Sequence, residues 1–98
     1  MTIENFEASF TQGKPPAGSS IYLQSLWYDH HGNWEQAHIL IQDLEADVIA
    51  AWIHAYLHRK EGDIWNADYW YRRANRTRPS FSLQDEWKQL VDYCITHT

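Results

Sequence analysis

The 98-residue chain has the length of one domain, and its 44% hydrophobic content, with six Trp and six Tyr, is sufficient for a core. No apolar run reaches the length needed to span a bilayer, and the acidic N-terminus lacks the basic and apolar segments of a signal peptide. The single Cys excludes an internal disulfide, and the net charge of −5 disfavours general nucleic-acid binding. These features predict a cytoplasmic protein whose partner is neither a membrane nor a nucleic acid.

The N-terminal segment differs in composition from the rest of the chain. Residues 13–20 hold two Pro, two Gly and two Ser, which favour extended structure and resist a helix. We therefore expect residues 1–18 to form an extended or disordered tail, ordered only where Phe6 and Phe10 find a surface. Residues 19–98 are expected to form a single helical domain.

Five segments of this domain carry apolar residues at helical spacing, approximately residues 20–31, 33–44, 47–61, 63–76 and 82–96. Gly32 and Gly62 can each end a helix in the left-handed conformation, and Asn33 and Asp63 can cap the helix that follows. Pro79 prevents continuation of the fourth helix. Short loops make consecutive helices antiparallel, so the sequence predicts an all-α fold of two helical hairpins and a C-terminal capping helix.

The two hairpin turns carry one signature twice, 30 residues apart. It reads GNWEQA over residues 32–37 and GDIWNA over residues 62–67. A short signature repeated at a fixed period is typical of proteins built from stacked helix–turn–helix units.

The second unit resembles a tetratricopeptide repeat. The residues that carry the resemblance are the turn glycine, two small residues, an aromatic residue and a closing proline, at Gly62, Ala67, Ala74, Tyr71 and Pro79. The stretch WYRRA over residues 70–74 is also similar to Sel1-like repeats, and residues 54–71 resemble short bacterial proteins of unknown activity. The period of 30 differs from the usual 34, and His54 and His58 stand where the repeat normally has Leu and Tyr.

This resemblance implies a protein- or peptide-interaction module without catalytic activity. Tetratricopeptide repeats bind ligands in a concave groove lined by the first helix of each unit, which would place Ile49, Trp52, Tyr56 and Arg59 in the groove. Arg72 and Arg73 would extend its positive charge, because six of the eight basic residues lie in residues 59–78, which carry a local charge of +3. The expected ligand is therefore an acidic or C-terminal-carboxylate peptide. The alternative is that the large side chains of this face are core.

His54 and His58 are four residues apart on one predicted helix and form half of a metal site. The candidates for a third ligand are Glu61, Asp68 and His38. Because no motif completes the set, we predict neither a metal nor a cofactor, and we expect both rings to lie in a polar seam between helices. The alternative function is a metal- or small-molecule-binding protein, or an enzyme, that uses His54, His58 and Tyr71.

The sequence offers no catalytic constellation. Cys94 lies on an apolar stripe, where a buried and inert thiol is expected. No phosphate-binding loop, nucleophile elbow or CxxC pair is found. A homodimer through exposed aromatic surface remains one way in which so few units could complete a core.

Overall fold

A computed structural model describes residues 1–97. All the regular elements within this range are helical, which confirms the all-α fold class. They are α1 (Ile3–Ala8), the 3-10 turn η1 (Ser9–Thr11), α2 (Ile21–His30), α3 (Trp34–Ile41), α4 (Val48–Glu61), α5 (Ile64–Arg73) and α6 (Leu83–His97).

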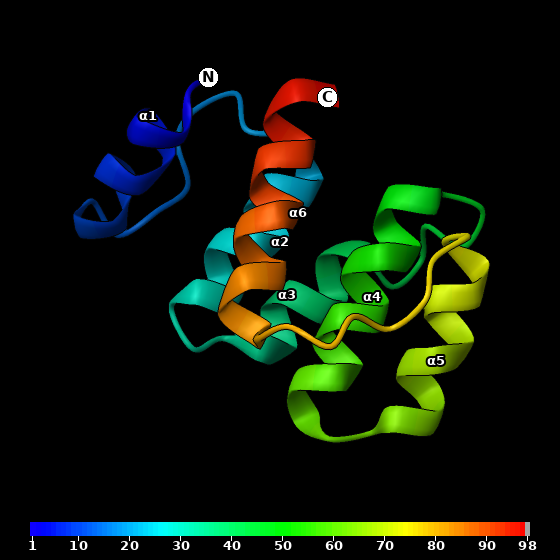
Figure 1. The fold of residues 1–98 in the computed structure, drawn as a ribbon. Helices are drawn as coiled ribbons and strands as arrows, with labels where there is room; N and C mark the ends of the chain where they lie inside the picture. The colour runs from blue at the N-terminus through cyan, green and yellow to red at the C-terminus, as the bar shows by residue number, and fades with distance from the viewer. Residues whose placement is uncertain (98) are drawn as a thin grey trace.

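Helices α2 and α3 form one hairpin, and helices α4 and α5 form the next (Figure 1). Both hairpins turn in the same way. Gly32 and Gly62 have φ values of +79° and +89°, so each takes the left-handed conformation that glycine favours. The side chains of Asn33 and Asp63 then accept hydrogen bonds from the backbone at the start of the following helix.

Helix α6 runs back across the first helices of both hairpins. It packs against α2 and α4, with a smaller contact to α1, whereas α5 packs against α4 (Figure 1). The C-terminal helix therefore covers the face that α2 and α4 share. It does not extend the stack beyond α5.

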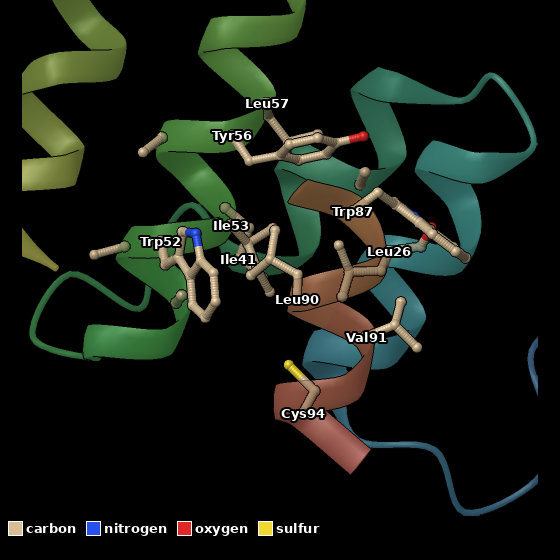
Figure 2. Packing of buried hydrophobic residues seen from close by; sticks show 14 of the residues in the cluster. Leu26, Ile41, Trp52, Ile53, Tyr56, Leu57, Trp87, Leu90, Val91 and Cys94 are labelled. Atoms are coloured by element: carbon tan, nitrogen blue, oxygen red, sulfur yellow. The ribbon is translucent and has the colours of Figure 1, made fainter. Parts of the chain in front are cut away.

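The core lies where α6 meets the two hairpins. Figure 2 shows Leu90 of α6 beside Ile53 of α4 and Ile41 of α3, and all three are at most 1% exposed. Val91 and Cys94 continue the buried stripe of α6. The Cys94 thiol is buried as expected, and burial raises its pKa to about 12.

The first half of the expected tail is helical, which corrects the extended or disordered structure predicted for residues 1–18, although Phe6 does find a surface as expected. Thr2 caps α1, and the ring of Phe6 is fully buried, 6.2 Å from the ring of Trp87 between centroids. The Ser9 hydroxyl also accepts a hydrogen bond from Trp27 Nε1 at 3.0 Å. Burial of one large aromatic side chain outweighs the weak helix propensity of so short a segment.

Candidate functional site: a histidine cluster and two buried carboxylates

Three imidazoles from two helices converge beside the hairpin seam. His54 and His58 lie one turn apart on α4, and His38 approaches them from α3. One ring nitrogen of each residue lies within 4.8 Å of the other two. Of the three candidates for a third ligand, the structure therefore brings His38 to the pair.

The imidazoles contact one another directly. His38 Nε2 and His54 Nε2 are 2.9 Å apart, at hydrogen-bond distance, and the rings of His54 and His58 stack with 4.8 Å between centroids. His54 and His58 are only 7% and 8% exposed, and His38 is half-buried. The expected polar seam is present, and it contains three imidazoles where the sequence predicted two.

Neighbouring side chains fix the orientation of each ring. The ring of Trp34 stacks on His38 at 4.9 Å, and the ring of Trp70 stacks on His54 at 3.9 Å. Glu61 Oε1 lies 2.6 Å from His58 Nδ1, so the carboxylate holds the third ring from the end of the same helix. The cluster is thus supported by α3, α4 and α5 together.

Two of these imidazoles are held neutral at neutral pH. Burial, followed by the charges of His38 and His58, lowers the pKa of His54 to about 3. Burial also lowers the pKa of His38, with His58 adding to the effect. Neutral imidazoles keep a lone pair that can accept a proton, a hydrogen bond or a metal ion.

Tyr71 does not join the histidines. Its hydroxyl donates to the carboxylate of Glu86, at 2.7 and 2.8 Å from the two oxygens. Glu86 is fully buried and also accepts hydrogen bonds from Trp52 Nε1 at 3.2 Å and from the Arg59 guanidinium at 2.9 Å. This carboxylate of α6 therefore ties three residues of the hairpin α4–α5 to the last helix, and burial together with Glu86 raises the pKa of Tyr71.

A second buried carboxylate joins α2 to α4. Asp29 is 2% exposed and accepts a hydrogen bond from the Tyr56 hydroxyl at 2.7 Å. Lys60 Nζ lies 2.9 Å from the other carboxylate oxygen. Burial, with Asp29 adding to it, raises the pKa of Tyr56, so this phenol stays protonated as a structural donor.

The expected groove residues are mostly core. Trp52 and Tyr56 are 3% and 2% exposed, and Ile49 is half-buried. Arg59 points to Glu86 and is largely covered. The physical reason is α6, which occupies the face that the sequence assigned to a ligand. The alternative, that these large side chains are core, holds for Trp52 and Tyr56.

The outer face of α5 remains uncovered. Trp65 is 79% exposed and Tyr69 is 37% exposed. Arg72 and Arg73, both expected at a binding site, are exposed on the same helix. Trp65 was missed in the sequence, although it lies about 200° around the helix from the core residue Ala67 and so had to face outward.

No protein-family model, curated protein or solved structure matches this chain. None of the helices in residues 1–97 has the length and apolar character required to cross a membrane.

Proposed function

We propose that the protein is a small tetratricopeptide-like interaction module, without catalytic activity, that binds an acidic protein or peptide through the outer face of α5. The exposure of Trp65 carries this proposal. The other five Trp side chains are buried or half-buried, whereas Trp65 is 79% exposed. Trp and Arg are the residues most often found at the energetic centre of protein interfaces.

The positive charge of this face favours an acidic ligand. Arg72 and Arg73 lie two turns after Trp65 and one turn after Tyr69, on the exposed side of α5. Just beyond the helix, Arg72, Asn75, Arg76 and Thr77 line a shallow and open depression. An acidic segment would place carboxylates on these guanidinium groups and an apolar side chain on Trp65.

A second copy of the chain is a poorer occupant of this face. A two-fold dimer brings the same patch of each subunit together. Such a dimer brings together two patches that carry the same positive charge, which is unfavourable. The homodimer is therefore an outcome to test, and the acidic partner is the proposal.

Fluorescence polarisation with a labelled panel of acidic peptides, each with one Phe or Leu, tests the assignment. We expect binding that weakens between about 0.1 M and 1 M salt, since the screening length falls from about 10 Å to about 3 Å. Trp65→Ala and the double variant Arg72→Glu/Arg73→Glu should each lower the affinity at least about tenfold, the effect of losing roughly 1.4 kcal/mol.

The matched control is Ile39→Ala, which removes a side chain that is 48% exposed on α3. This variant should bind like the wild type. No binding by any peptide of the panel, or equal losses in Ile39→Ala and Trp65→Ala, would refute the assignment. A dimer in light scattering that Trp65→Ala dissociates would favour the second copy instead.

A further inference from the structure

We propose that His38, His54 and His58 bind one divalent transition-metal ion, with zinc as the expected metal and Glu61 as the residue that positions His58. This proposal departs from the sequence-based expectation of no metal, because the structure adds His38 to the predicted pair. The site is independent of the peptide surface on α5 proposed above. It rests on three observations: the convergence of the ring nitrogens, the contact of Glu61 with His58 Nδ1, and the support of the rings by tryptophans.

The spacing of the nitrogens suits a small ion. Zinc binds imidazole nitrogen at about 2.0–2.1 Å, which places the nitrogens of a tetrahedral site about 3.3 Å apart. Here the three nitrogens already lie within 4.8 Å of one another, and the Nε2 atoms of His38 and His54 are 2.9 Å apart. The ring that donates this hydrogen bond must carry its proton on Nδ1 instead before both Nε2 atoms can bind the ion. An ion therefore requires the distances between the nitrogens to change by at most about 1.5 Å.

Glu61 makes His58 a competent ligand. A carboxylate that accepts from Nδ1 of a histidine keeps the proton on that nitrogen and leaves a lone pair on Nε2. The contact of 2.6 Å between Glu61 Oε1 and His58 Nδ1 is of this kind. The same contact is also an ordinary i, i+3 pair along α4, so the case for a metal depends on the convergence of all three rings.

The rings are also held in place before an ion arrives. Trp34 stacks on His38, and its Nε1 is anchored to the carbonyl of Leu57 at 2.8 Å. Trp70 stacks on His54 at 3.9 Å. Ligands that are already oriented lose little conformational entropy on binding. An ion here would join α3 of the first hairpin to α4 of the second, as structural metals do in small domains.

Three imidazoles leave one position of a tetrahedral zinc for water or for another ligand. A competing set of ligands exists nearby, formed by His58, Glu61 and Asp63. Glu61 and Asp63 are exposed, as acidic groups often are without any metal. The experiment must therefore separate the two sets.

Isothermal titration of the chelator-treated protein with zinc chloride provides the test. We expect one ion per chain. His38→Gln should weaken zinc binding by at least about a hundredfold, because a ligand is lost, whereas Glu61→Gln should weaken it about tenfold, because only the orientation of His58 is lost. Two matched controls should bind like the wild type. Asp63→Asn keeps an N-cap on α5 while removing the competing carboxylate, and His97→Gln removes an exposed histidine at the end of α6.

A second measurement uses the wild-type protein and does not depend on whether a variant folds. Imidazole nitrogen NMR spectra recorded with and without zinc should show shifts of the nitrogen signals of His38, His54 and His58, with the signals of His30, His31 and His97 unchanged. Absence of stoichiometric zinc binding would overturn the proposal. So would shifts confined to the other three histidines, or a loss in Asp63→Asn equal to that in His38→Gln.

Discussion

At the scale of single residues, two buried carboxylates each connect two or more helices. Glu86 and Asp29 are fully or almost fully buried, and each accepts hydrogen bonds from an aromatic donor and a cation. A buried ion pair adds little stability compared with an apolar pair of similar shape, but removal of one partner leaves an uncompensated buried charge. The structural role of Glu86 and Asp29 is therefore to fix how α2, α4 and α6 pack together.

Glu86→Ala should lower the free energy of unfolding by about 3–5 kcal/mol, because it strands Arg59 and leaves the donors of Trp52 and Tyr71 unpaired. Urea denaturation measures the loss. Asp92→Ala, at an exposed position of the same helix, is the control and should cost less than about 0.5 kcal/mol. Similar losses of unfolding free energy in the two variants would show that the hydrogen bonds of Glu86 are not important for the stability of the fold.

The sequence contained part of the information about these residues. Glu86 lies three residues after Leu83 and four before Leu90, on the apolar stripe of its helix, so its burial beside a cation could have been inferred. The hydrogen-bond donors to Glu86 could not be inferred from the sequence. They come from α4 and α5, and whether they reach Glu86 depends on the side of the hairpins on which α6 lies. The histidine pair was predicted in a seam, whereas the arrival of His38 depends on the packing of α3 on α4.

At the scale of elements, the turns are the features that local sequence determines best. The glycine stops and the caps after them predicted α2 to α5 to within three residues at each end. The left-handed conformation of Asn75 after α5, with φ of +59°, was not predicted. Helix α1 was missed because a segment of six residues has no periodic pattern to read. Its order comes from Phe6, a contact distant in sequence.

Gly62→Ala should destabilise the protein by about 1 kcal/mol, since a side chain at φ of +89° is strained even though an added Cβ would contact nothing within 4 Å. Gly32→Ala should cost about the same, because its turn has the same geometry. Gly62→Asn should cost less, as Asn tolerates the left-handed region. Thermal unfolding of the three variants checks this order, and a stabilised Gly62→Ala would contradict it.

Phe6→Ala tests the order of the N-terminal segment. The ring is fully buried against Phe10 and Trp87, so its loss should cost about 3 kcal/mol. Glu4→Ala, at an exposed position of α1, should have little effect. If Phe6→Ala unfolds at the same urea concentration as the wild type, residues 1–18 behave as the tail that their composition predicted.

At the scale of the whole molecule, the decisive feature is the return of α6 across α2 and α4. It converts an open pair of hairpins into a closed core and moves the accessible aromatic surface to the outer face of α5. The apolar stripe of α6 predicted that the helix would pack, but a stripe does not specify its neighbour. Two helical hairpins alone bury little surface, so the added contacts of α6 complete the core.

The histidine cluster should make the metal-free protein less stable in mild acid. His54 faces His38 and His58, and its pKa falls from 6.5 in the unfolded chain to about 3 in the folded protein. Between these values the unfolded state binds the extra proton, so stability is complete above about pH 6.5 and is lost as the pH falls, by up to about 1.4 kcal/mol per pH unit. Urea denaturation in the presence of chelator at several pH values should show this dependence of the free energy of unfolding on pH.

His54→Leu should flatten this slope between about pH 6.5 and pH 4, whatever its effect on stability at neutral pH. His97→Gln, which removes an exposed imidazole, should leave the slope as it is. An unchanged slope in His54→Leu would mean that this imidazole takes up a proton in the folded protein.

The most direct test of the binding surface is a peptide titration followed through the indole N–H signals of nitrogen-15-labelled protein. Trp52 Nε1 is buried and donates to Glu86, whereas Trp65 is exposed on α5. When an acidic peptide is added, the Trp65 signal should move in step with saturation, and the Trp52 signal should stay in place. Movement of Trp52 with Trp65 unchanged would contradict the account, because the ligand would then have displaced α6 and entered the groove between the hairpins.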